Sequence, residues 1–210
     1  MDTKKTLQKY LEELSSNSPT PGGGNVAALC GVLSASLGTM VCNLTIGKKK
    51  YIEVEQEMKE LKEKLSTYSE KFIQLGKNDN EAFDRVMDAF KLPKETDEQK
   101  KLRGEAIEKA TFEAAYVPAE VIKNCREVIP ILETISHKGN QNSLSDAGVA
   151  IAVIAAASEG AFLNVLINYS ALAEKQKAAE LLSNADADNN EVKAETESIL
   201  TEIKMKIRGN

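Results

Sequence analysis

Hydrophobic residues recur three and four positions apart along most of the chain, which is the spacing of amphipathic helices. The clearest case is a seam between residues 54 and 75, with Glu and Lys filling most of the intervening positions. The seam consists of Val54, Met58, Leu61, Leu65, Tyr68, Phe72 and Leu75. Alternating spacings of four and three indicate one long helix that packs as in a coiled coil. No segment shows the polar–apolar alternation and β-branched richness of a strand. The pattern therefore predicts an all-α fold without a sheet.

Glycines, prolines and polar clusters divide this pattern into roughly eight helices, beginning with a short one over residues 7–14. The expected breaks are residues 15–24, 47–51, 76–79, 92–96, 117–118, 137–145 and 185–190. At the third break Asp79 is expected to cap the start of a new helix. Pro118 is expected to open a helix or to kink it.

Two long segments are almost free of charge. Residues 25–46 contain no charged side chain, and residues 147–168 contain only Glu159. Both are long enough to span a membrane, but their Ala, Gly, Ser and Asn content favours helices buried inside a protein. Glu159 would then need a cationic partner such as Arg85, Arg103 or Arg126.

Small side chains recur at helical spacing in both segments, which allows helix backbones to approach closely. The stripes are Ala28, Gly31, Ala35, Gly38 and Cys42, and Gly148, Ala152, Ala156 and Gly160. We expect an elongated helical bundle with two buried Ala/Gly-rich helices. A chain of this size rarely encloses two such helices completely, so a homodimer is expected to cover one face of each.

Composition narrows the possible functions. The 210 residues suit one domain over residues 1–210, with an ordinary 42% hydrophobic and 28% charged content. A net charge of −5 and 5% aromatic residues argue against a nucleic-acid partner. One histidine, His137, leaves little basis for a zinc site or a serine triad. Three cysteines without a CxxC motif, and no signal-peptide pattern, favour a reducing, cytoplasmic location.

A glycine-rich motif precedes the first uncharged helix and offers a site for a ligand. Its residues are Pro19, Thr20, Pro21, Gly22, Gly23, Gly24 and Asn25. Glycines permit close contact, and a helix N-terminus presents free N–H groups to an anion. The same motif is equally typical of a plain turn between helices. A dinucleotide fingerprint is excluded because no strand precedes the glycines.

A polar run precedes the second uncharged helix in the same way. Asn140, Asn142, Ser145 and Asp146 lie at its start, with Ser145 as the expected N-cap and Asp146 in the first turn. Convergent polar groups beside an apolar cleft are the usual form of a small-molecule site. The first uncharged helix ends in Lys48, Lys49 and Lys50, which is either a solvated helix end or a patch for an anionic ligand.

The motifs taken together resemble the family of formimidoyltetrahydrofolate cyclodeaminases and methenyltetrahydrofolate cyclohydrolases. The resemblance rests on an ordered set that covers nearly the whole chain. The set is PTPGGG, NLTIGKKKY, DNEAFDRVM, LPK, YVP and GNQNSLSDAGVA, followed by NVLIN. It implies an all-helical, dimeric, cytosolic enzyme that binds reduced folate and needs no metal or other cofactor.

Two related reactions follow from this resemblance. The cyclohydrolase adds water to methenyltetrahydrofolate and gives formyltetrahydrofolate. The cyclodeaminase expels ammonia from formimidoyltetrahydrofolate and closes the methenyl ring. We expect the cyclohydrolase, because the chain is too short to include a formiminotransferase domain. The alternatives are the cyclodeaminase and a helical dimer that binds folate without turnover.

The resemblance also implies roles for the residues of these motifs. Asp146 is the first candidate for acid–base catalysis and Asp79 the second, and either can instead bind the pterin ring. The expected substrate-binding residues are Pro21, Gly22, Gly23, Gly24, Asn25, Lys48, Lys49, Lys50, Asn140, Asn142 and Ser145. The three lysines would meet the glutamate tail of the folate.

Overall fold

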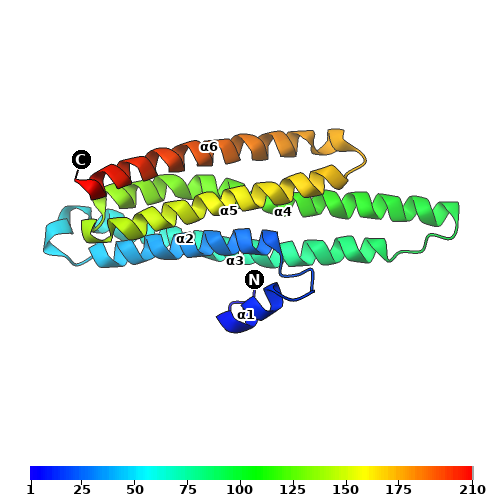
Figure 1. The fold of residues 1–210 in the computed structure, drawn as a ribbon, viewed down its shortest axis with the longest axis horizontal. Helices are drawn as coiled ribbons and strands as arrows, with labels where there is room; N and C mark the ends of the chain where they lie inside the picture. Colours follow the sequence, from blue (N-terminus) through cyan, green and yellow to red (C-terminus); the bar gives the residue numbers. More distant parts are fainter. Residues whose placement is uncertain (210) are drawn as a thin grey trace.

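The structure, a computed structural model, describes residues 1–209, and this part of the chain is helical without any strand. The order is α1 (Leu7–Leu14), α2 (Gly23–Thr45), the 3₁₀ turn η1 (Lys49–Val54), α3 (Glu55–Phe90), α4 (Asp97–Lys138), the 3₁₀ turn η2 (Gln141–Ser143), α5 (Leu144–Ala171) and α6 (Lys175–Arg208). The predicted all-α class and elongated bundle are confirmed (Figure 1).

The five long helices form two layers. In Figure 1, α2 and α5 lie in front of α3 and α4, and α6 runs along the upper edge against α5. Contacts between residues far apart in sequence show that α2 and α5 are antiparallel. Ser34 donates to the carbonyl of Ala150 at 2.7 Å, and Gly160 lies against Ala27. The start of α2 therefore lies near the end of α5.

Small residues let large side chains of α3 and α4 pack directly on the α2 backbone. A Cβ on Gly31 would lie 2.6 Å from the ring of Phe72, and one on Gly38 would lie 2.8 Å from Leu65 and Leu132. Phe72, Leu65 and Leu132 are almost fully buried. The predicted stripe on α2 and the seam on α3 thus pack against each other, and filling these contacts with a methyl group would overpack the core.

Helix α3 runs unbroken through residues 76–79, so the predicted stop and the N-cap role of Asp79 are wrong. Gly76 is a packing position instead of a helix end. A Cβ there would meet Ala28 Cβ at 3.4 Å and Asn25 Nδ2 at 3.5 Å on the neighbouring helix. The glycine thus serves the α2–α3 contact, and the helix gains enough from tertiary packing to pass through it.

Helix α6 also continues through the predicted break at residues 185–190. Ala185 is buried, and the side chain of Asn189 is buried between two polar partners on α5. Ser158 donates to Asn189 Oδ1 at 2.7 Å, and Asn189 donates to Glu159 Oε2 at 3.0 Å. Polar residues that looked like a loop are therefore satisfied within a helix pair. Glu159 is exposed and pairs with this amide, so the predicted cationic partner is wrong.

Helix α4 passes through Pro118 and Pro130, which replaces the two predicted helices with one. A proline at position 118 has no N–H for the carbonyl of Ala114. Asn168 on α5 donates its Nδ2 to that carbonyl at 3.3 Å. A neighbouring helix thus supplies the missing hydrogen bond, and the break is avoided. The start of α4 follows the prediction, with Thr96 and Gln99 forming a reciprocal capping box.

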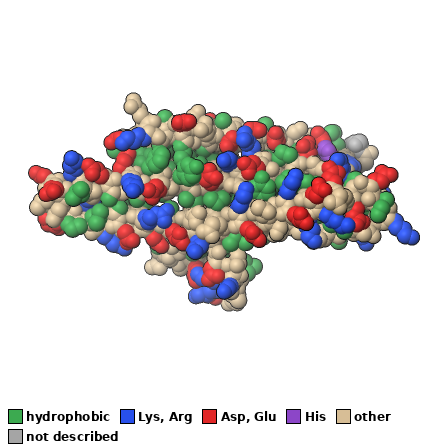
Figure 2. Space-filling model, turned by 180° about the vertical axis from the view of Figure 1, so that it is seen from behind, with side chains coloured by type: hydrophobic (Ala, Val, Ile, Leu, Met, Phe, Trp, Pro, Cys, Tyr) green, Lys and Arg blue, Asp and Glu red, His purple; other side chains and the backbone are tan. Residues whose placement is uncertain are grey.

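The front of the α2–α5 layer is apolar and uncovered. Leu33, Leu163 and Ile167 are 49%, 58% and 65% exposed, and Met40 and Val149 are exposed on the same two helices. By length and composition both α2 and α5 could cross a membrane, yet 50% and 39% of their most apolar windows are buried in the bundle. On the opposite side of the molecule, charged side chains of both signs are distributed over the surface (Figure 2).

Candidate functional site

The predicted site residues fall into two groups at opposite ends of the α2–α5 pair. The glycine end consists of Pro21, Gly22, Gly23, Gly24, Asn25 and Asp79, and the lysine end consists of Lys48, Lys49, Lys50, Asn140, Asn142, Ser145 and Asp146. Because α2 and α5 are antiparallel, the two helix N-termini do not meet within one chain. The glycine motif and the 140–148 run therefore do not form one site within a single copy.

At the glycine end, Asp79 lies directly against the first turn of α2. A Cβ on Gly24 would overlap the Asp79 carboxylate, so only glycine allows this approach. Gly22 is the N-cap of α2 and gives no side-chain cap, which leaves the helix N-terminus open to other acceptors. The Thr20–Pro21 peptide bond that leads into this turn is cis.

The surroundings of Asp79 hold its pKa above the ordinary value of 3.8. Burial is the main cause, since it disfavours the charged form, while a hydrogen bond from the Asn25 backbone N–H and the nearby N-terminal ammonium oppose it. A half-buried carboxyl with a raised pKa beside a helix N-terminus is suited to exchanging a proton or to accepting a hydrogen-bond fork.

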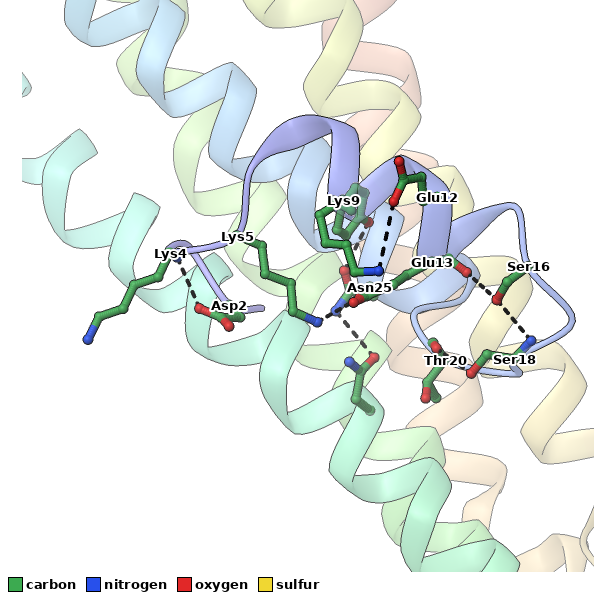
Figure 3. A network of polar contacts seen from close by, with 12 residues as sticks. Asp2, Lys4, Lys5, Lys9, Glu12, Glu13, Ser16, Ser18, Thr20 and Asn25 are labelled. Carbon is green, nitrogen blue, oxygen red and sulfur yellow. Dashed lines mark hydrogen bonds and ion pairs between the residues drawn. The ribbon is translucent and has the colours of Figure 1, made fainter.

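Asn25 lies at the centre of a buried polar network at the glycine end. Its side chain is 1% exposed, donates to the carbonyl of Gly76 at 2.6 Å and to Asn80 Oδ1 at 3.2 Å, and accepts from the Tyr10 hydroxyl at 3.0 Å. Figure 3 shows this amide where α1 meets the bundle. Asn25 therefore holds α1, α2 and α3 in register and orients the turn that faces Asp79.

Asn164 completes the glycine end from the other side, and sequence reasoning did not select it as a site residue. A Cβ on Gly23 would lie 3.3 Å from Asn164 Nδ2. The first turn of α2 is thus flanked by Asp79 on α3 and by Asn164 on α5. The available signal was the NVLIN motif, whose two asparagines were noted only as part of the resemblance.

At the lysine end, hydrogen bonds join the end of α2, the end of α4 and the start of α5. The Asn140 N–H donates to Thr45 Oγ1 at 2.8 Å, its side chain donates to the carbonyl of Leu44 at 2.9 Å, and its Oδ1 accepts from the Asn142 N–H at 3.1 Å. The Gln141 N–H donates to the hydroxyl of Tyr51 at 3.0 Å. The hydrogen bonds of Asn140 thus hold the backbone between α4 and α5 against the end of α2.

Asp146 lies in the first turn of α5, as predicted, and is partly exposed. The helix begins at Leu144 with Ser143 as its N-cap, so the predicted N-cap role of Ser145 is wrong. Ser145 is exposed and lines a hollow of 440 Å³ with Lys206 on α6. Lys48, Lys49 and Lys50 are exposed just before and within η1, and the Lys50 ammonium lies 5.4 Å from the centre of the Tyr51 ring.

One face of α5 carries a polar residue at the lysine end and another at the glycine end. Asp146 and Asn164 are 18 residues apart, which is five helical turns, so they project in the same direction about 27 Å apart. Within the described part of one chain the two ends stay apart. Within residues 1–209 no cluster of three or more His, Cys, Asp and Glu side chains is arranged to hold a metal ion.

Comparison with known proteins gives one consistent result. The family model described as "Formiminotransferase-cyclodeaminase" matches residues 6–187. A methenyltetrahydrofolate cyclohydrolase of Methylorubrum extorquens is 42% identical over 207 residues, covering 99% of this chain and 100% of the relative. The formimidoyltransferase-cyclodeaminase of Mus musculus is 32% identical over 163 residues, covering 78% of this chain and 30% of that longer protein.

The fold matches a solved structure over almost its whole length. A crystal structure of formiminotetrahydrofolate cyclodeaminase from Thermotoga maritima superposes with a TM-score of 0.86 at 27% sequence identity. The match covers 97% of this chain and 98% of the other.

Proposed function

Because the chain belongs to the formiminotransferase-cyclodeaminase family, we propose that it is a methenyltetrahydrofolate cyclohydrolase. The full-length similarity to the Methylorubrum cyclohydrolase supports this activity most directly. The structure supports it through the carboxylates that it places beside two helix N-termini. We further propose a cytoplasmic enzyme of one domain that works without a metal or organic cofactor.

The reaction requires proton transfer at one electrophilic carbon. Water adds to the cationic methenyl carbon and loses a proton, and a carbon–nitrogen bond of the five-membered ring then breaks as the nitrogen gains a proton. We assign the removal of the proton to Asp146, which is partly exposed to water. Asp79, with its raised pKa, binds the pterin ring or returns the proton.

A homodimer would complete this site. A two-fold axis across the middle of the α2–α5 face would place the lysine end of one copy over the glycine end of its partner. The separation of Asp146 and Asn164 along one face of α5 fits such an axis, since the rotation would exchange the two positions. The exposed, largely apolar face of α2 and α5, on which Glu159 is an exposed charge, is the surface that such a dimer would bury.

Mixing two variants of reduced activity tests this composite site. Asp79→Asn and Asp146→Asn homodimers would each carry one lesion in both of their sites. Random subunit exchange would give mixed dimers with one intact site, restoring about a quarter of wild-type activity. Sites contained within single chains would show no recovery, and that outcome would contradict the composite site.

The activity itself is tested by following the absorbance of methenyltetrahydrofolate with and without the protein. We expect bleaching faster than buffer hydrolysis, and a rate equal to that of buffer would contradict the cyclohydrolase. The similarity to the Thermotoga cyclodeaminase makes that enzyme the second candidate function. It predicts that formimidoyltetrahydrofolate gives the methenyl chromophore together with ammonia. Folate binding without either change would instead favour a non-catalytic binding protein.

A further inference from the structure

Two asparagines of α5 lie close together at the glycine end, yet their hydrogen bonds differ. Asn168 donates to the carbonyl that Pro118 leaves free on α4, and also to the carbonyl of Asn164. Its amide thus replaces a hydrogen bond that the fold would otherwise lack. This contact gives Asn168 a structural role.

Asn164 makes no such bridge between helices. Its Nδ2 donates to the carbonyl of Gly160 in its own helix at 2.8 Å, which fixes the orientation of the amide. Its Oδ1 accepts no hydrogen bond from the described residues. The amide lies beside Gly23, where the backbone of α2 has no side chain to cover it.

The other polar side chains of this end are already committed. Asn25 makes three hydrogen bonds, and Asn80 accepts one of them. Asp79 faces Gly24 and the Asn25 N–H. Two acceptors with remaining capacity therefore flank the start of α2: the Asp79 carboxylate, which accepts one hydrogen bond from the Asn25 N–H, and Asn164 Oδ1.

We propose that Asn164 is a substrate-positioning residue, whose Oδ1 accepts a hydrogen bond from a ring N–H of the pterin while Asp79 binds it from the opposite side of the glycine turn. This role rests on the proposed folate activity and deepens it. Asp79 and Asn164 together present acceptors to a heterocycle rich in N–H donors.

Substitutions at the two asparagines separate positioning from structure. Asn164→Leu removes the acceptor at similar volume, and Asn164→Asp retains an acceptor oxygen. Losing one ground-state hydrogen bond should raise KM about tenfold and leave kcat within about twofold. Asn164→Asp should keep KM nearer to the wild-type value than Asn164→Leu does. Asn168→Ala should lower the melting temperature without raising KM.

A binding measurement distinguishes failure of this inference from failure of the proposed function. Calorimetric titration of each dimeric variant with 5-formyltetrahydrofolate gives Kd without turnover. We expect Asn164→Leu to weaken binding about tenfold and Asn168→Ala to leave it unchanged. Equal binding by wild type and Asn164→Leu would overturn the role of Asn164, whether or not the enzyme turns over. No binding by wild type, together with no acceleration of methenyltetrahydrofolate bleaching, would overturn both proposals.

Discussion

The glycine end and the lysine end of the α2–α5 pair are built by different means. At the glycine end, packing determines the site: Gly24 has no side chain because Asp79 occupies that space, and burial raises the pKa of Asp79. At the lysine end, backbone hydrogen bonds determine the site, and its charged groups, Asp146 and the three lysines, remain open to water. Asp79 is therefore a half-buried carboxyl in a packed site, and Asp146 is a partly exposed one in a charged, hydrated site.

This difference indicates which end is suited to binding the pterin ring and which is suited to supplying water. A close-packed end with few degrees of freedom is suited to binding a flat ring, because its groups are already ordered. An open end is suited to delivering water and to attracting an anionic tail. Substitutions at the glycine end should accordingly affect ligand binding and stability, and substitutions at the lysine end should affect turnover and attraction of the tail.

The largest effect is expected at the open end. Asp146→Asn should lower kcat by about 10²- to 10⁴-fold while the fold is retained, because it removes the proposed base at almost unchanged volume. Asp97→Asn is the matched control, since Asp97 also lies in the first turn of a helix. Both should lose less than about 1 kcal/mol of stability from the helix dipole. Near-wild-type turnover of Asp146→Asn would remove Asp146 from the chemistry.

The packing of the glycine end predicts a loss of stability as well as activity. Gly24→Ala should destabilise the protein by about 1–3 kcal/mol, because the new methyl group displaces the Asp79 carboxylate. Gly104→Ala, in α4, meets no atom within 4 Å and should gain about 0.5–1 kcal/mol. Thermal unfolding of the two variants tests the comparison. A Gly24→Ala protein as stable as Gly104→Ala would show that the close approach is unimportant.

Asp79→Asn should reduce kcat/KM by about tenfold or more, through loss of a charge-assisted hydrogen bond to the ligand. It should also stabilise the protein at neutral pH. Folding raises the pKa of Asp79, so the native state disfavours its ionised form, and this penalty is fully present above the raised pKa. The penalty declines as pH falls through the raised pKa toward the ordinary value of 3.8.

Denaturant unfolding of wild type and Asp79→Asn across this acidic range measures the change directly. The stability advantage of the variant should narrow as the pH is lowered. An advantage that widened on acidification would contradict the raised pKa.

The smallest effect is expected from the exposed lysines. Replacing Lys48, Lys49 and Lys50 by Gln should raise KM for polyglutamylated folate by about three- to tenfold and change KM for the monoglutamate less, because screened surface charges act weakly. Gln at Lys94, Lys100 and Lys101, which lie around the α3–α4 turn, provides the control. Equal effects on both substrates would exclude binding of the tail at the lysine end.

Much of this architecture could be predicted from the sequence. The spacing along 54–75 predicted the seam of α3, the small-residue stripe of α2 predicted the close approach of other helices to its backbone, and the break at 92–96 predicted the start of α4. These features depend on side-chain periodicity and on local capping, which neighbours in sequence determine. The stripe predicted on α5 is wrong as a packing face, because Ala152 and Ala156 are exposed. The order of the motifs along the chain also predicted the family, because the family shows the same motifs in the same order.

Predictions of helix breaks from glycine, proline and polar residues were wrong where a neighbouring helix packs against those residues. Gly76, Pro118 and the polar stretch of 185–190 resemble breaks, yet partners on other helices fill or satisfy each of them. Because α3 continues through Gly76, Asp79 lies inside the helix and not at its start. This position places its carboxylate against Gly24. Whether a glycine ends a helix or packs against its neighbour depends on contacts that no local pattern encodes.

The sequence by itself determined the helical class, the two uncharged helices and the residue types available for chemistry, because periodicity and composition are properties of the chain. Only the tertiary structure decided that α2 and α5 are antiparallel, that Asp79 and Asp146 therefore lie at opposite ends, and that Asn164 joins Asp79 beside the glycine turn. The physical reason is that helix direction is determined by how faces pack across long stretches of sequence. That packing also leaves the α2–α5 face open.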